Sequence, residues 1–350
     1  MQIEANRNFA NKLWNCVSFV VNNALKDVAF DSKEWNALAP GDSCELIVDD
    51  LPLPERWIIN RCDKLIASVT KDLEGYNFGV AGGKIYEFLW DDYADWYVEI
   101  SKTRLYEGLK LDKTTPFDKE QALMSQKVLV YAIDRVLRVL HPFMPFVTEH
   151  LFHHIPRRGD GGSLMLNNWP SVDEDKLEND ATAATQAKFD LFQKLIRSIR
   201  NARAEYKVEQ GKKIEAFVLV DGTERVADLS SELASLVLLA KIDPETVKIV
   251  ERGSEEGQNI STMKECVVCF VDGNCEAILP RSSLIDADKE KERLKKGLEK
   301  GAKEIEKLKG RLSGGFVDKA PAEVVQKARD ELAELEAQQQ KMTEGLSQID

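Results

Sequence analysis

The C-terminal segment carries the pattern that most constrains the fold of this chain. Apolar and small residues alternate steps of four and three on both sides of the pair Gly314 and Gly315. The first series is Leu294, Leu298, Gly301, Ile305, Leu308 and Leu312, and the second is Val325, Ala328, Leu332, Leu335, Gln339, Met342 and Leu346. A period of 3.5 residues is typical of helices that wind around each other. We therefore predict an antiparallel coiled-coil arm over residues 284–350, with legs roughly 37 Å long.

Charge is distributed unequally between the two legs. Asp288 to Arg311 contains ten basic and six acidic residues, whereas Asp318 to Asp350 contains four basic and eight acidic residues, so the net charges are +4 and −4. A cationic strip of this kind can follow phosphates. Attraction between the legs is an alternative explanation, and Phe316 at the turn could either stack on a base or cap the coil. The candidate contact residues of the arm are Lys289, Lys291, Arg293, Lys295, Lys296, Lys300, Lys303, Lys307, Arg311, Phe316 and Lys319.

Residues 1–178 show the periodicity of long helices. The opening segment places Phe9, Leu13, Trp14, Val17, Val20 and Val21 on one apolar stripe. A polar, proline-containing connector follows at 38–54, and Pro54 stands where the next helix can begin. A further helix after Asn77 has Val80, Ile85, Phe88, Leu89, Trp96, Tyr97 and Ile100 as its predicted buried side. Helices are also predicted over 119–140 and 146–154, so this region is expected to be a helical bundle.

In residues 179–283 the pattern changes from long helices to short β-rich runs. A long helix over 180–206 precedes four β-rich runs at 214–220, 246–250, 266–271 and 276–279, with a helix near 227–239. This pattern predicts a small α/β junction domain. The fold class is therefore mainly α: a helical bundle, a small α/β domain and a coiled-coil hairpin.

The overall composition excludes some classes of protein. The formal net charge of −12 argues against bulk attraction to nucleic acid, although a local basic face can act on an acidic protein. No apolar run approaches the roughly 20 residues that span a bilayer. Six cysteines without a dense framework suit a reducing compartment. We expect a soluble intracellular protein with no membrane partner.

Three clusters could carry chemistry. Cys266 and Cys269 have zinc-ligand spacing, but residues three apart on a strand point to opposite faces. His150 and His154 share a helical face, yet no third ligand is identifiable by spacing, and the segment lacks the order of a zincin helix. Asp92, Asp95 and Glu99 stand among aromatic residues, where packing and orientation explain them better than acid–base work. We predict no catalytic residue and no metal site.

Four segments of the helical region form recognisable motifs: NRNFANKLWN (6–15), LPERWIIN (53–60), YNFGVAGGKIYEFLWDDYADWYVEISK (76–102) and LHPFMPFVTE (140–149). They are similar to the anticodon-binding bundle of class I aminoacyl-tRNA synthetases, and within that class they resemble the valyl-tRNA synthetase family most. RNARAEYKVEQGKKIEAFV (200–218) resembles the junction that follows the bundle in the valine enzyme. LIDADKEKERL (284–294) and GFVDKAPAEVV (315–325) resemble its C-terminal arm, which the isoleucine and leucine relatives lack.

The resemblance implies a monomer that binds valine tRNA, and not DNA, at two places. The bundle would hold the anticodon stem-loop, and the arm would press on the outer corner of the tRNA. The candidate anticodon contacts are Arg7, Asn8, Lys12, Asn15, Lys64, Lys102 and Arg104. The family activates valine with ATP and Mg through a His-x-Gly-His motif and a Lys-Met-Ser-Lys-Ser loop, and neither occurs here. We expect this chain alone to be inactive as a ligase and to hold no cofactor.

Two other functions compete with tRNA binding. The arm could bind partner helices in a non-catalytic scaffold derived from a synthetase, or the helix with His150 and His154 could serve a metal-dependent hydrolase. The expected compartment is the cytoplasm, or the chloroplast stroma or mitochondrial matrix for an organellar enzyme.

Overall fold

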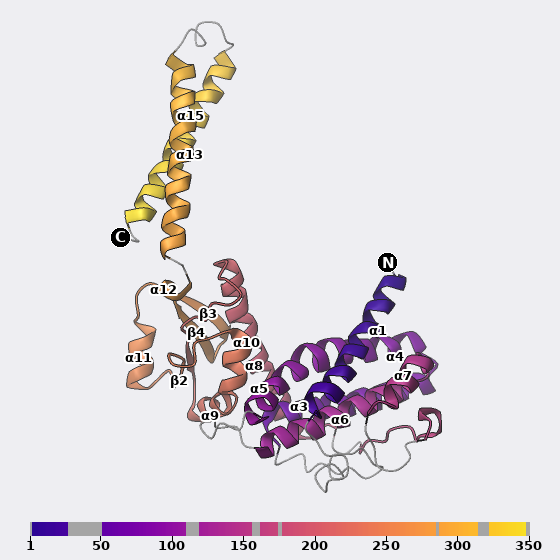
Figure 1. The fold of residues 1–350 in the computed structure, drawn as a ribbon. Coiled ribbons are helices and arrows are strands. Elements are labelled where there is room, and N and C mark those ends of the chain that lie inside the picture. Colours follow the sequence, from indigo (N-terminus) through magenta and orange to yellow (C-terminus); the bar gives the residue numbers. More distant parts are fainter. Residues whose placement is uncertain are drawn as a thin grey trace.

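A helical bundle, a small α/β unit and a two-helix arm follow one another along the chain (Figure 1). The computed structural model describes residues 2–26, 51–109, 119–155, 162–173, 177–284, 287–313 and 322–347. This arrangement confirms the predicted mainly α fold class. The arm and the N-terminal helix rise from the same side of the molecule, at its two ends.

The bundle is formed by long helices that pack around one apolar core. Its helical segments are α1 (Gln2–Phe19), the π-helical η1 (Val20–Ala24), α3 (Leu53–Glu74), α4 (Phe78–Glu87), the π-helical η3 (Phe88–Tyr97), α5 (Val98–Leu109), α6 (Lys119–Leu140) and α7 (Pro145–Phe152). Pro54 lies in the first turn of α3, as predicted, because proline costs no hydrogen bond there. Most of the predicted 38–54 connector lies outside the described residues.

The helix predicted after Asn77 is present, but its central part has π geometry. The wider turn of η3 buries Tyr93, Trp96 and Tyr97 together with Phe88, Leu89 and Ala94. Val80 was predicted on the buried side and is 53% exposed. That prediction is wrong because Val80 lies five residues before Ile85, so in the α-helical α4 their side chains point about 140° apart, and Ala81 shares the buried face with Ile85 instead.

Helix α8 (Asp180–Glu205) joins the bundle to the α/β unit. It follows a short 3-10 turn, η4 (Leu164–Leu166), and begins at Asn179, whose side chain accepts a hydrogen bond from the backbone N–H of Thr182. Near its N-terminal half, Phe189 stacks on Trp57 of α3 at 3.9 Å between ring centres. Its C-terminal half packs on the sheet, so the apolar core runs without a break from one unit into the other.

The α/β unit contains a four-stranded mixed sheet with the order β2-β1-β4-β3. Its elements are β1 (Phe217–Val220), α9 (Thr223–Ser231), α10 (Leu233–Ala240), β2 (Lys248–Glu251), α11 (Glu255–Ser261), β3 (Cys266–Asp272), β4 (Cys275–Pro280) and α12 (Arg281–Leu284). β1 pairs parallel with β2 and antiparallel with β4, which pairs antiparallel with β3. All four predicted strands are present. The single helix predicted near 227–239 is instead two helices that meet at Glu232.

The arm consists of α13 (Ala287–Ser313) and α15 (Ala322–Ser347), which pack along each other (Figure 1). Ile305 and Val325 are buried at predicted core positions. The ammonium of Lys309 lies 2.6 Å from the Glu336 carboxylate and joins the two legs. These contacts confirm the predicted coiled-coil hairpin, whereas its tip, including Phe316 and Lys319, lies outside the described residues.

Arg104 of α5 ties the bundle to the α/β unit. Its Nη1 donates to both Glu55 oxygens at 2.6 and 2.7 Å, and its Nη2 donates to both Glu232 oxygens at 2.8 and 2.9 Å. Arg104 is 2% exposed, and both carboxylates are buried. The hydroxyls of Ser125 and Ser235 donate to Glu55 and Glu232, respectively. Glu232 occupies the break between α9 and α10, so the break presents it to the guanidinium.

Two carboxylates share this one guanidinium, so the group would carry a buried net negative charge if both were ionised. Burial raises the pKa of Glu232 to about 7, and the Arg104 charge opposes that rise only in part. The folded protein therefore holds a proton near neutral pH that an unfolded chain has released.

We predict that Arg104→Met lowers the free energy of unfolding by about 3–5 kcal/mol, because it leaves two buried carboxylates without their cation. Thermal unfolding followed by circular dichroism measures the loss. Arg197→Met, at an exposed arginine of α8, is the control and should change stability little. Equal unfolding midpoints for the two variants would contradict the role given to Arg104.

The raised pKa of Glu232 also predicts a pH dependence. Because its folded pKa lies above its unfolded value, its contribution to stability is complete below about pH 4.5 and is lost as the pH rises through about 7. From pH 5 to pH 8 the loss should be roughly 2–3 kcal/mol. Glu232→Gln should flatten this part of the profile, measured by urea unfolding. A variant with the same slope as the unaltered chain would show that Glu232 does not titrate in this range.

Candidate nucleic-acid interface

The exposed face of α1 carries four of the polar residues that the sequence singled out. Arg7, Asn8 and Asn15 are exposed, and the guanidinium of Arg7 lies 4.0 Å from the Glu4 carboxylate. Lys12 is half-buried, with its ammonium 2.6 Å from Asp95 and 4.8 Å from the centre of the Trp90 ring. The structure thus brings these four residues together on one helix above η3.

Aromatic rings flank this face and were not predicted as site residues. Trp14 is 46% exposed and stacks on His150 of α7, with ring centres 5.3 Å apart and planes 14° apart. Tyr86 of α4 is 40% exposed and stacks on Phe9 of α1 and on Trp90. Flat rings that are half open to solvent and fixed by stacking can accept an unpaired base.

The sequence contained a signal for this surface. Trp14 follows the core residue Leu13 directly, and on a helix adjacent residues point about 100° apart, so both cannot lie at the centre of one buried stripe. Trp14 had been assigned to the apolar stripe because periodicity alone does not separate the centre of a stripe from its edge. The structure places it at the edge, next to His150 and His154.

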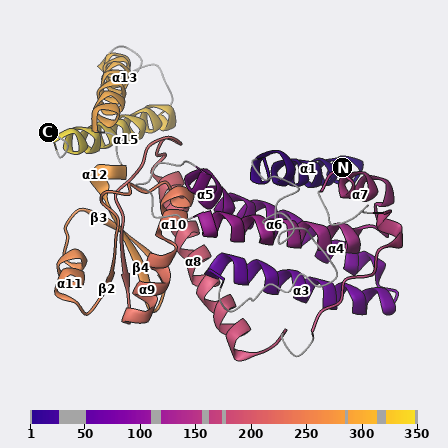
Figure 2. The same ribbon diagram turned by 60° about the horizontal axis from the view of Figure 1, so that its bottom comes forward.

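The remaining bundle candidates are dispersed. Lys64 is half-buried on α3, which lies on the other side of the bundle from α1 (Figure 2). Lys102 is half-buried on α5, with its ammonium 2.5 Å from Glu99 and 5.6 Å from the Phe19 ring of α1. Arg104 does not fit a surface role, and that prediction is wrong. In the sequence Arg104 looks like any other polar residue of an amphipathic helix, and nothing there shows that it faces two buried carboxylates.

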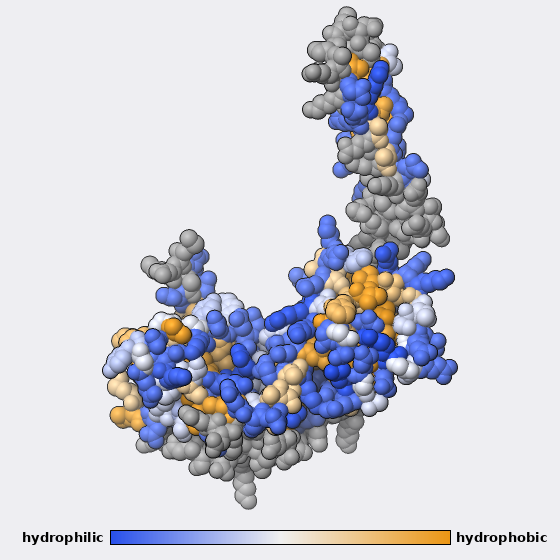
Figure 3. All heavy atoms as spheres, turned by 180° about the vertical axis from the view of Figure 1, so that it is seen from behind, coloured by the Kyte–Doolittle hydropathy of each residue, from blue (hydrophilic) through white to orange (hydrophobic). Residues whose placement is uncertain are grey.

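On the arm, several predicted contact residues of α13 lie at the surface. Lys296, Lys300, Lys303 and Lys307 are exposed. Lys289, Lys291, Arg293, Lys295 and Arg311 lie on the same helix, and their side chains are outside the described set. Hydrophilic side chains cover the described surface of the arm, whereas apolar surface gathers on the α/β unit below it (Figure 3).

The other clusters have structural partners. Cys266 and Cys269 lie on opposite faces of β3, with Cys269 in the main core and Cys266 against the smaller cluster around Ile260. Across the described ranges, no three His, Cys, Asp or Glu side chains come together in a way that could hold a metal ion. Asp92, Asp95 and Glu99 pair with Arg61, Lys12 and Lys102, respectively.

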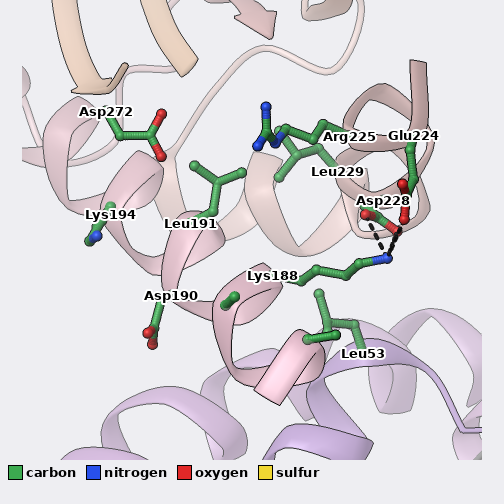
Figure 4. A pocket seen from close by; sticks show the side chains of 12 residues that line it. Leu53, Lys188, Asp190, Leu191, Lys194, Glu224, Arg225, Asp228, Leu229 and Asp272 are labelled. Atoms are coloured by element: carbon green, nitrogen blue, oxygen red, sulfur yellow. Dashed lines mark hydrogen bonds and ion pairs between the residues drawn. The ribbon is translucent and has the colours of Figure 1, made fainter. Parts of the chain in front are cut away.

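A cavity of about 510 Å³ lies between α3, α8 and α9 (Figure 4). Lys188 points across it to the carboxylates of Glu224 and Asp228, with contacts of 3.1 and 3.0 Å. The hydrogen bonds that Lys188 donates to Asp228 and Glu224 raise the pKa of its ammonium group. None of the predicted contact residues lines this cavity. Lys188 is thus paired with two carboxylates where the bundle meets the α/β unit.

Comparison with known proteins identifies both the helical bundle and the arm. Residues 55–218 match the family model of the anticodon-binding domain of tRNA ligases. Residues 286–350 match that of the valyl-tRNA synthetase tRNA-binding arm. The chain belongs to the valyl-tRNA synthetase family. It comprises the anticodon-binding domain and the tRNA-binding arm of these proteins, and is therefore a tRNA-binding portion.

Curated relatives match nearly the whole chain. The valine--tRNA ligase, chloroplastic/mitochondrial 2, of Arabidopsis thaliana is 37% identical over 96% of this chain and 32% of its own length. The valine--tRNA ligase of Bacillus subtilis is 31% identical over 98% of this chain and 35% of its own length. That of Thermotoga maritima is 34% identical over 94% and 32%. The chain thus spans about a third of the length of the relatives it matches.

These findings also bear on the alternatives. The arm matches a tRNA-binding module by name, so a scaffold that binds only partner helices is not favoured. None of the helices in the described ranges has the length and apolar character needed to cross a membrane.

Proposed function

We propose that this chain is the part of a valine--tRNA ligase that binds valine tRNA. Residues 1–178 hold the anticodon stem-loop, and residues 284–350 press on the outer corner of the tRNA. Residues 179–283 form the junction domain that connects these two parts. The observation that best supports this proposal is the position of the two candidate surfaces. Helix α1 and the arm rise at opposite ends of one side of the molecule (Figure 1). An L-shaped RNA can contact both without either unit moving.

The bundle contact uses stacking and hydrogen bonding. Trp14 and Tyr86 offer ring faces to unstacked bases, and Arg7, Asn8 and Asn15 offer donors at the same helix face. The ammonium of Lys12 is held by Asp95, so it sets the position of α1 against η3 and adds little net charge. Lys64 lies on the other side of the bundle, and Arg104 is buried, so neither belongs to this contact.

The arm contact is electrostatic. Lys300, Lys303 and Lys307 are exposed along α13, on the leg whose net charge is positive. Lysine ammonium groups along a rigid rod suit a phosphate backbone, and such contacts weaken as counterion concentration rises. The protein can therefore bind RNA despite a net charge of −12.

Amino-acid activation is assigned elsewhere in the ligase. Neither His-x-Gly-His nor Lys-Met-Ser-Lys-Ser occurs in these 350 residues, so this chain alone binds tRNA without forming valyl-adenylate. ATP and Mg belong to the activity of the whole enzyme. We propose that the chain acts as a monomer where translation takes place, in the cytoplasm, the chloroplast stroma or the mitochondrial matrix.

Trp14→Ala should weaken binding of an isolated valine anticodon stem-loop roughly tenfold, because one base loses its stacking partner. Fluorescence anisotropy with labelled RNA measures the affinity. Phe270→Ala removes an exposed ring from β3, far from α1, and should leave the affinity unchanged. If the two variants bound the stem-loop equally well, Trp14 would not be a stacking platform.

Replacing Lys303 and Lys307 by Gln should reduce the slope of log K against log salt for full-length valine tRNA by up to about 2, because up to two phosphate contacts are lost. Binding of the isolated anticodon stem-loop should not change. Lys71→Gln with Lys248→Gln removes the same charge from α3 and β2 and serves as the control. An unchanged slope in the arm variant, or an equal change in the control, would contradict the arm contact.

A further inference from the structure

Two arginines of α8 share one aromatic ring. The guanidinium carbons of Arg197 and Arg200 lie 5.4 and 6.0 Å from the centre of the Trp96 ring of η3. Both arginines are exposed and lie three residues apart, so they occupy neighbouring positions on one helical face. Trp96 is buried and meets Phe189 edge to face, which fixes the ring against which the arginines rest.

The guanidinium groups of Arg197 and Arg200 are held in place but keep N–H donors for a further partner. Nε of Arg200 donates to the Leu239 carbonyl oxygen at 2.8 Å, and this bond leaves the two Nη groups of Arg200 available for another partner. Stacking on Trp96 restricts Arg197 in the same way. Less side-chain freedom is therefore lost when either residue binds an anion.

Arg203, one turn further along α8, has a structural role and serves as a comparison for Arg197 and Arg200. It is buried, and its Nη1 and Nη2 donate to the carbonyl oxygens of Lys241 and Glu209. By contrast, within the described part of the chain neither Arg197 nor Arg200 has a carboxylate within ion-pair distance. Glu99 acts on Arg200 through its field, but its carboxylate already contacts Lys102 at 2.5 Å. Glu99 is thus the carboxylate that these contacts place beside Lys102 and Arg200, and Arg197 adds a further positive charge over the same Trp96 ring, so the four groups sum to +2.

This cluster lies on the side of the bundle that carries α1. Lys102 reaches the Phe19 ring at the C-terminal end of α1, and Glu99 connects Lys102 with Arg200. Helix α8 itself packs on α3 in the bundle and on β3 and β4 in the α/β unit. Helices α5 and α8, which carry these three residues, lie between α1 and the unit that precedes the arm (Figure 1).

We propose that Lys102, Arg197 and Arg200 form a third RNA contact, a phosphate clamp for the tRNA backbone between the anticodon loop and the outer corner. The clamp rests on the proposed function, because an RNA that contacts both α1 and the arm passes over this cluster. Guanidinium groups bind phosphate oxygens in a bidentate fashion, and such contacts carry no sequence information. The clamp would set the position of the tRNA and leave its discrimination to the anticodon contact.

The test compares tRNA binding by the full chain and by Arg197→Gln with Arg200→Gln across a range of salt concentrations. We expect affinity for valine tRNA to fall about tenfold or more and the salt slope to decrease by about 1–2. A non-cognate tRNA should lose affinity by the same factor, because phosphates are common to both RNAs. Lys71→Gln, which removes one exposed charge from α3 on the other side of the bundle from α1 (Figure 2), is the control for the single variant Arg197→Gln and should bind as the unaltered chain does.

The outcomes separate the clamp from the function on which it rests. If the unaltered chain binds no tRNA, the proposed function fails and the clamp fails with it. If the unaltered chain binds tRNA and the double Gln variant matches its affinity and salt slope, only the clamp is overturned. Arg197→Lys with Arg200→Lys keeps both charges and should recover at least half of the lost slope. A Lys variant as weak as the Gln variant, with the same reduced slope, would show that charge at these positions does not hold RNA.

Discussion

The buried guanidinium of Arg104 determines how the two folded units of this protein sit together. It holds Glu55 of α3 and Glu232 between α9 and α10, so bundle and α/β unit share one ionic group as well as one apolar core. Burying these charges is costly unless each is paired, so the contact favours one relative position of the two units. The arm is the next part of the chain, since α12 ends at Leu284 and α13 begins at Ala287. The Arg104 contact therefore fixes how the bundle, which carries α1, lies against the unit that precedes the arm.

An acidic protein binds a polyanion here by arranging its charges unevenly. Most bundle cations near α1 are paired, as Lys12 is with Asp95 and Lys102 with Glu99. In our proposal, positive charge for the RNA comes from the exposed lysines of α13 and from the pair Arg197 and Arg200. The half-open rings of Trp14 and Tyr86 would supply contacts that do not depend on charge. Affinity and base recognition would then be divided between different parts of the surface, as is usual for proteins that bind structured RNA.

Much of the fold could be predicted from the sequence, because its strongest signals are periodic. The 3.5-residue repeat specified the arm, and period-2 runs specified four strands. Three features could not be predicted in this way. The π geometry of η3 depends on how Tyr93, Trp96 and Tyr97 pack against neighbouring helices, which the local sequence pattern does not contain. The break at Glu232 and the burial of Arg104 depend on a contact between residues 128 apart in the chain, which no local pattern contains. For the site, charge and polarity indicated the α1 face, but the exposure of Trp14 and the shared Trp96 ring are tertiary properties.

The central claim is that one rigid chain grips a single tRNA at the anticodon stem-loop and at the outer corner together. Hydroxyl-radical footprinting of valine tRNA bound to the full chain tests this most directly, because it reports every protected stretch of backbone in one experiment. The account predicts protection of the anticodon stem-loop and of the outer corner, with the acceptor end left accessible. Protection confined to one of the two regions, or spread evenly over the whole tRNA, would contradict it.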